Sequence, residues 1–197
     1  MLQWNDSSIC RGIWCKKSSL LARGDHGSIE DGVIPHMTEI EDLRAQLQGA
    51  LMSRAMVYAA VYDEIAKEFD EAKAEEILKR AIYARGAAIG DRFSGHAPAD
   101  FAALRDAFLD FVPDHGRLFR PEVVRCDGEG LDIKFHACPL KEAWEEAGFA
   151  PERVETLCRI AGIVDRGTFE QAGFALQPDT WKVGGEGCCF LHIRRKA

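Results

Sequence analysis

A cysteine–proline pair, Cys138-Pro139, lies where a strand pattern ends and a helix pattern begins. Residues 131–136 alternate apolar and polar side chains, and the apolar residues from Leu140 onward recur at helical spacing. Because proline favours the first position of a helix, Cys138 is predicted to be the N-cap residue. The free amides and the helix dipole favour negative charge there, so the thiol is expected to ionise readily, as a nucleophile, metal ligand or redox group must. The alternative interpretation is a small buried residue in a tight junction.

Asp165 places a carboxylate on an otherwise apolar stripe. The pattern predicts one helix over about 151–172, on which Cys158 and Asp165 are seven residues apart and therefore within about 20° of each other. An unpaired carboxylate among apolar side chains is unfavourable, so Asp165 is expected either to have a charged partner or to face a cavity.

Two arginines, Arg54 and Arg85, interrupt the apolar stripes of two earlier predicted helices, and Gly86 next to the second leaves room for a close approach. One interpretation is an internal ion pair between Asp165 and either arginine. The other is a polar pocket in which an arginine binds a substrate carboxylate while Asp165 transfers protons or holds an amidinium.

The last predicted strand contributes a further thiol. Alternation over residues 188–194 places Cys188 on the polar face and Cys189 on the core face, so Cys189 is expected to be a packed thiol and Cys188 a functional candidate. A zinc site formed by Cys188, Cys138, Cys158 and a histidine is chemically feasible, but no C-x2-C or H-x3-H spacing supports it. Neither a metal nor another cofactor is therefore predicted.

The elements that position these residues indicate an α+β fold. The helical N-terminal half, three helices, is expected to pack with a four-stranded antiparallel sheet of two hairpins, with a helix pair between the hairpins. Its first helix begins at a capping box, Thr38 to Glu41, and Asp127-Gly128-Glu129-Gly130 marks the first hairpin turn. The predicted helices cover about 40–69, 71–92, 98–112, 139–147 and 151–172, and the strands 122–126, 131–136, 180–183 and 188–194.

Composition bounds the partners. The 197 residues are 47% hydrophobic, and a net charge of −7 argues against nucleic acid or an anionic membrane as partner. No apolar run approaches the roughly 20 residues of a membrane helix, and no signal-peptide core is evident, so a cytoplasmic protein is expected. Seven cysteines, an odd number, then indicate free thiols. A small-molecule substrate is the expected partner, and a homo-oligomer is compatible with the sequence.

The first 36 residues differ from the rest, because they show neither a helical nor a strand period. Met37 directly precedes the capping box, so the native start is expected there. Residues 1–37 are predicted to be a disordered or loosely attached extension, followed by a single domain over 38–197.

The distal residues resemble the L-2-amino-thiazoline-4-carboxylic acid hydrolase family over about 120–194. The matching elements are Cys138-Pro139, Leu157-Cys158, Asp165, Thr180, Gly184-Gly185 and Cys188-Cys189-Phe190. The resemblance implies a hydrolase that opens a five-membered cyclic amidine bearing a carboxylate by cleaving a ring C–N or C–S bond, with a carbamoyl-cysteine as product.

That chemistry requires attack at the amidine carbon, a proton for the leaving atom and a group that binds the carboxylate. Cys138 or Cys158 is a candidate nucleophile, with Cys188 as a further catalytic candidate; Asp165 is the acid/base, and the two arginines are candidates to bind the carboxylate. Alternatively, a bound water attacks and the cysteines only shape the pocket. The competing functional class is a non-enzymatic sensor domain that binds a small molecule or a metal.

Overall fold

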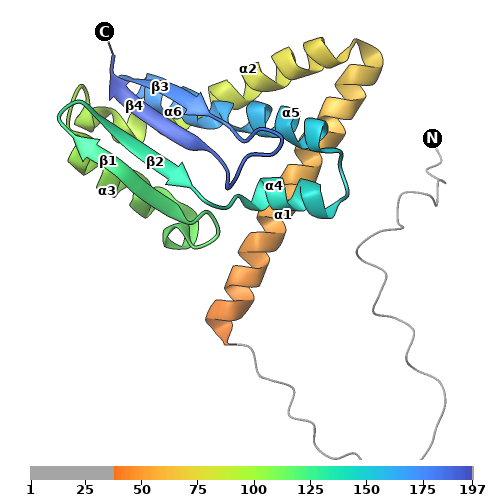
Figure 1. Ribbon diagram of the computed structural model, residues 1–197, viewed down its shortest axis with the longest axis horizontal. Helices are drawn as coiled ribbons and strands as arrows, with labels where there is room; N and C mark the ends of the chain where they lie inside the picture. Colours follow the sequence, from red (N-terminus) through yellow and green to blue (C-terminus); the bar gives the residue numbers. More distant parts are fainter. Residues whose placement is uncertain (1–37, 197) are drawn as a thin grey trace, which may run out of the picture. The chain divides into compact units, whose positions relative to one another are not determined.

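The computed structural model describes residues 38–196, which form an α+β unit as predicted. The helices are α1 (Glu39–Glu68), α2 (Glu71–Gly90), α3 (Phe101–Phe111), α4 (Pro139–Glu146), α5 (Pro151–Ala161) and α6 (Ile163–Gln171), with 3-10 segments η1 (Asp91–His96) and η2 (Pro113–Gly116). The strands are β1 (Pro121–Asp127), β2 (Gly130–Phe135), β3 (Phe174–Asp179) and β4 (Phe190–Arg195) (Figure 1). The extension expected over residues 1–37 lies outside the described residues.

The long first helix begins at the predicted capping box. The Thr38 hydroxyl accepts a hydrogen bond from the Glu41 amide at 3.3 Å, and the Glu41 carboxylate accepts one from the Thr38 amide at 2.8 Å. These contacts satisfy two of the amides that a helix N-terminus leaves free. The buried residues of α1 begin only at Leu51, and its N-terminal part, which projects beyond the sheet in Figure 1, contacts η2 through an ion pair between Arg44 and Asp114 at 2.8 Å.

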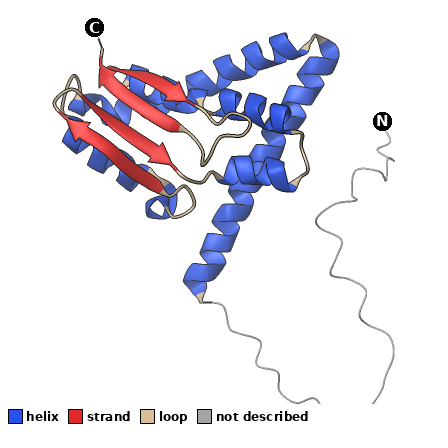
Figure 2. Ribbon diagram, in the orientation of Figure 1, coloured by secondary structure: helices blue, strands red, loops and turns tan. Residues whose placement is uncertain are grey.

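The four strands form one antiparallel sheet in the order β1-β2-β4-β3. Apolar side chains alternate along the strands and pack against α3 and α6. These inward side chains are Leu131, Ile133, Phe135, Phe174, Leu176, Leu191 and Ile193. Figure 2 shows the helices behind one face of the sheet, while no described helix covers the face toward the viewer.

The second hairpin exists, but its first strand was predicted in the wrong place. The strand is β3, which ends before the predicted segment 180–183 begins. Phe174 and Leu176 supply its inward positions, and Pro178 is tolerated because β3 lies at the edge of the sheet. The predicted segment instead belongs to the connection to β4, where Trp181 is buried and donates its indole N–H to the Gly185 carbonyl at 2.8 Å.

The helix predicted over 151–172 is also two helices, α5 and α6, which meet at Gly162. A side chain at this position would overlap Thr180, because a Cβ would lie 2.6 Å from its Cγ2. Two other glycines let α2 and α6 cross with their backbones in contact. A Cβ on Gly86 would overlap the Val164 carbonyl, and one on Gly167 would overlap the carbonyl of Tyr83. The close approach that Gly86 suggested is therefore made by α6.

The buried side chains form two cores. One lies among α1, α2, α4 and α5 around Trp144, whose indole N–H donates to the Ala55 carbonyl at 2.8 Å. The other lies between the sheet and α3, η1 and α6, around Phe169. Phe119 and Cys138 pack against both cores, so the residues predicted to do chemistry lie near the junction. Within residues 38–196, no helix combines the length and the hydropathy needed to cross a membrane.

Candidate functional site

A cavity of about 360 Å³ lies where the two cores meet. Its walls come from α1, α2, α3, α4, α5, α6, the end of β2 and the segment before β4. Every residue predicted for the site lines it: Arg54, Arg85, Cys138, Cys158, Asp165 and Cys188. The fold thus brings together side chains that are far apart in the sequence, whereas their chemical roles stay predictions.

Asp165 lies in the first turn of α6 and is closely surrounded by protein, although it keeps some accessible surface toward the cavity. Burial raises the pKa of its carboxyl from 3.8 to about 7, and the positive charge of Arg54 opposes this shift only partly. Among the described residues, no side chain or amide donates a hydrogen bond to this carboxylate. The internal ion pair considered from the sequence is therefore not formed.

Arg54 and Arg85 line the cavity, but both are exposed. The sequence placed Arg85 within an apolar stripe, whereas the buried face of α2 runs beside it through Leu78, Ile82 and Gly86. The Arg54 guanidinium lies 6.0 Å from the centre of the Tyr58 ring. The ion pairs of the described residues use other arginines, so these two keep their hydrogen-bonding capacity for a ligand.

Cys138 is the N-cap residue of α4, as predicted from Pro139. The expected thiolate is not favoured, however. The neighbouring Cys188 thiol and burial raise the pKa of Cys138 well above its ordinary value, and the amides of Leu140 and Lys141 lower it by less. Tertiary burial thus outweighs the local effect of the helix N-terminus.

The other two thiols are also neutral at physiological pH. Burial raises the pKa of Cys158 to about 12. Contact with Cys138 lowers the pKa of Cys188, but Cys189 and burial outweigh that effect, so it lies above its ordinary value. The Cys188 and Cys189 sulfurs are 3.6 Å apart.

The predicted contrast between Cys188 and Cys189 is reversed in the structure. Cys188 is the buried residue and Cys189 is only half-buried, although both line the cavity. The alternation argument failed here because β4 begins at Phe190, so the two cysteines precede the strand. Within β4, the alternation holds: Leu191 and Ile193 are buried, and the residues between them are not.

Sequence reasoning missed the aromatic part of the lining. Phe108 and Phe111 from α3, Phe119 from the segment before β1 and Phe135 from β2 all line the cavity. In the sequence they are indistinguishable from ordinary core residues. Thr168 was also missed as a lining residue, but its hydroxyl donates to the Val164 carbonyl at 2.9 Å and is therefore already engaged.

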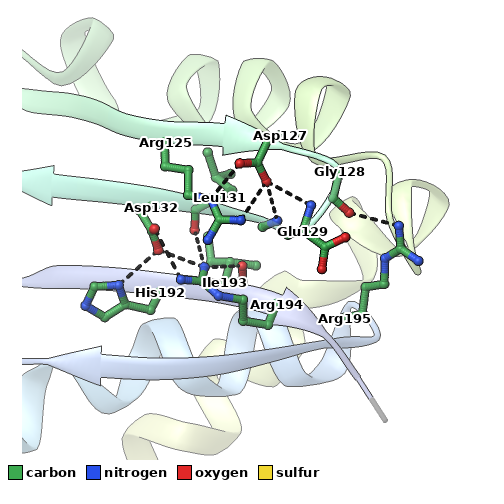
Figure 3. A network of polar contacts seen from close by, with 11 residues as sticks. Arg125, Asp127, Gly128, Glu129, Leu131, Asp132, His192, Ile193, Arg194 and Arg195 are labelled. Atoms are coloured by element: carbon green, nitrogen blue, oxygen red, sulfur yellow. Dashed lines mark hydrogen bonds and ion pairs between the residues drawn. The ribbon is translucent and has the colours of Figure 1, made fainter.

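A second enclosed carboxylate, Asp132 on β2, provides a contrast. It accepts hydrogen bonds from Arg194 Nη1 at 2.7 Å and Nη2 at 3.2 Å, and it lies 2.9 Å from His192 Nδ1 (Figure 3). Burial alone would raise the pKa of Asp132, but the bonds to Arg194 and His192 outweigh it and hold the pKa below 3.8.

In the part of the chain that the structure describes, no group of three acidic, cysteine or histidine side chains is arranged to hold a metal ion.

The fold and the cavity define an α+β protein in which an acid and two arginines, unpaired among the described residues, line a common cavity with several neutral thiols. The chain belongs to the L-2-amino-thiazoline-4-carboxylic acid hydrolase family, whose sequence model matches residues 50–193 and so includes the whole predicted site. This confirms the resemblance seen in the distal residues. No curated protein matches the chain. A crystal structure of a trafficking protein particle complex subunit 3 from Naegleria fowleri, covalently bound to palmitic acid, is similar with a TM-score of 0.48 and 19% identity, over 75% of this chain and 96% of that one.

Proposed function

We propose that the protein hydrolyses a small cyclic amidine or amide that bears a carboxylate, with water as the attacking group and Asp165 as the general base. The observation that carries this proposal is the state of Asp165. A carboxyl group with a pKa of about 7 accepts and returns a proton at physiological pH, and no described residue donates a hydrogen bond to it. The family name, which refers to a hydrolase of an amino-thiazoline carboxylate, supports the same class of reaction.

The two arginines suit the substrate carboxylate. Guanidinium groups bind carboxylates through paired hydrogen bonds, and Arg54 and Arg85 line the cavity with no protein anion as partner among the described residues. The arginines would therefore hold the ring with its amidine carbon deeper in the cavity.

The proposed reaction then needs one base and one acid in succession. As the water oxygen forms a bond to the amidine carbon, the π electrons of the C=N bond move to the nitrogen and the Asp165 carboxylate takes one proton of the water. The C=O bond then forms as the ring C–S or C–N bond breaks; the protonated Asp165 gives its proton to the leaving ring atom, and the hydroxyl proton passes to the amidine nitrogen. The product carries a carbamoyl group, and Asp165 returns to its starting state.

The thiols are assigned to the wall of the cavity rather than to covalent catalysis. With a pKa of about 12, ionising Cys158 at pH 7 costs on the order of 7 kcal/mol before any attack begins. Among the described residues, no histidine lines the cavity to assist such an ionisation, and Asp165 is the one carboxylate in its lining.

Turnover of 2-amino-thiazoline-4-carboxylate, followed by mass spectrometry of the carbamoyl-cysteine product, tests the proposal. Asp165→Asn is expected to lower kcat/KM by about 10²–10⁴-fold, the usual contribution of a general base. Asp110→Asn, at an exposed position of α3 outside the cavity lining, is the matched control and should retain full activity. Binding of this and related rings without any turnover would instead identify a sensor domain.

A further inference from the structure

The cavity has two chemically different parts. The charged residues Arg54, Arg85 and Asp165 come from α1, α2 and α6. Most of the remaining lining is apolar, and several of its phenylalanine side chains pack in the core of the sheet. These include Phe108, Phe119 and Phe135, and Val112 and Ile89 continue the same wall. A ligand that contacts only the charged residues would leave this wall without a partner.

The volume supports the same conclusion. A cavity of about 360 Å³ holds about a dozen water molecules at their bulk volume of about 30 Å³ each. A thiazoline ring with its amino and carboxylate groups has nine non-hydrogen atoms, and a bonded atom occupies less space than a free water. Such a ring alone therefore leaves part of the cavity to be filled, and an apolar wall favours an apolar group over water.

The rim of the cavity matches an amphipathic ligand. Phe111 lines the cavity and is still 40% exposed, with the Arg92 guanidinium 5.2 Å from the centre of its ring. Arg54 and Arg85 are exposed on other walls of the same cavity. Both an anionic and an apolar group therefore meet a matching side chain where the cavity opens.

We propose that the ring hydrolysed by this protein carries an apolar substituent of about phenyl size, which packs against the phenylalanine-lined wall while the carboxylate binds the arginines. This inference rests on the proposed function and narrows its substrate class. The bare amino-thiazoline carboxylate is then a poor substrate, and the preferred ones are cyclic amidine or amide carboxylates with an aromatic or branched aliphatic side chain.

Binding of open-chain analogues separates this inference from the hydrolysis. N-carbamoyl-L-alanine and N-carbamoyl-L-phenylalanine share the ureido and carboxylate groups of a ring-opened product and differ in the apolar side chain. Calorimetric titration of the full chain is expected to give a Kd at least about tenfold lower for the phenylalanine derivative, since each buried methylene in an apolar pocket contributes about 10–200-fold. Equal affinities, or tighter binding of the alanine derivative, would overturn the inference.

A cavity-filling variant tests where the substituent binds. Val112→Phe adds volume at a buried lining residue at the end of α3, and Val123→Phe makes the same change at an exposed position of β1 outside the lining. Val112→Phe is expected to weaken binding of the phenylalanine derivative at least about fivefold and to leave the alanine derivative unchanged; Val123→Phe should affect neither. An equal loss for both ligands in Val112→Phe would contradict the assignment of the aromatic wall.

Phe111→Ala provides a second variant, should Val112→Phe fail to fold. Removing the exposed ring at the rim should weaken the phenylalanine derivative by about threefold or more, again without affecting the alanine derivative. An unchanged Kd for the phenylalanine derivative would count against the inference. If the protein prefers the phenylalanine derivative but opens no ring, the proposed function is refuted and the inferred binding mode stands. If it opens rings without that preference, the inference about the apolar substituent is refuted and the proposed function stands.

Discussion

Asp132 and Asp165 are the same residue type in enclosed surroundings, yet their carboxyl groups differ in ionisation. Asp132 accepts hydrogen bonds from Arg194 and interacts with His192, and its pKa lies below 3.8. Asp165 has no such partner among the described residues, and its pKa rises to about 7. Burial disfavours the charge at both positions, so the partners decide the outcome. The carboxylate on the sheet is paired within the structure, whereas the one in the cavity is paired with none of the described residues.

Glu75 on α2 supports the same comparison. Hydrogen bonds from Arg159 at 2.7 and 2.8 Å lower its pKa to about 2 despite partial burial, and they connect α2 to α5. Arginine pairing is therefore the ordinary way in which this fold accommodates a carboxylate between elements. Arg54 and Arg85 line the same cavity as Asp165 without forming such a pair, which is consistent with a ligand between them.

Replacing each aspartate by asparagine should change stability in opposite directions. The pKa of Asp165 is raised above its unfolded value of 3.8, so the native protein loses stability as the pH rises from about 4 to 7. Asp165→Asn removes this pH-dependent loss. The difference in free energy of unfolding, variant minus wild type, should therefore rise by on the order of 2–3 kcal/mol when the pH is raised from 5 to 8. Urea unfolding at both pH values measures the difference, and a pH-independent difference would contradict the raised pKa.

Asp132→Asn should be destabilising where Asp165→Asn is stabilising. The pKa of Asp132 is lowered, so its contribution is present above pH 4 and is lost as the pH falls through the folded pKa. Losing the charged bonds to Arg194 and His192 should cost about 1–3 kcal/mol at pH 7 in the same urea experiment. Activity per folded molecule should stay at the wild-type level, because Asp132 does not line the cavity.

The two arginines should be separable by pH. Arg54→Ala and Arg85→Ala should each raise KM about tenfold, about the effect of losing a charged hydrogen bond to the substrate carboxylate. Because Arg54 lowers the pKa of Asp165, Arg54→Ala should also move the acid limb of the kcat/KM profile to higher pH. Arg85→Ala should leave that limb in place. Arg80→Ala, an exposed residue of α2 paired with Glu76, is the control and should change neither KM nor the profile.

Cys158→Ala should have the smallest effect. A buried thiol that only shapes the wall should change kcat/KM less than about tenfold, with some loss of stability from the cavity left behind. A loss of turnover as large as that expected for Asp165→Asn, in a variant that remains folded by circular dichroism, would instead support Cys158 as the nucleophile.

Features with local causes could be predicted from the sequence. The capping box at Thr38 and the N-cap position of Cys138 depend on residues within one turn, and both are confirmed. The break between α5 and α6 at Gly162 was not predicted. The strand β3 was also missed, because Pro178 argues against a strand except at the edge of a sheet, and the edge position is a tertiary feature.

The site divides in the same way. Polar residues on apolar stripes, such as Asp165, led to the cavity lining. A charged side chain on an apolar helix face is visible in the sequence, and burying it is unfavourable unless it has a partner or faces a cavity. The protonation of the thiols and the aromatic wall depend on tertiary burial, which no local pattern encodes. Cys138 shows this most clearly, since its N-cap position was predicted correctly and its ionisation was not.

The pKa of Asp165 is the quantity on which this account depends. A carbon-13 NMR titration of the aspartate carboxyl groups, with Asp165→Asn and Asp132→Asn to assign the two signals, measures it directly. We expect the Asp165 carboxyl to titrate near pH 7. The Asp132 carboxyl should titrate below 3.8, the ordinary pKa of an aspartate. Titration of both groups at or below that ordinary value would contradict the account.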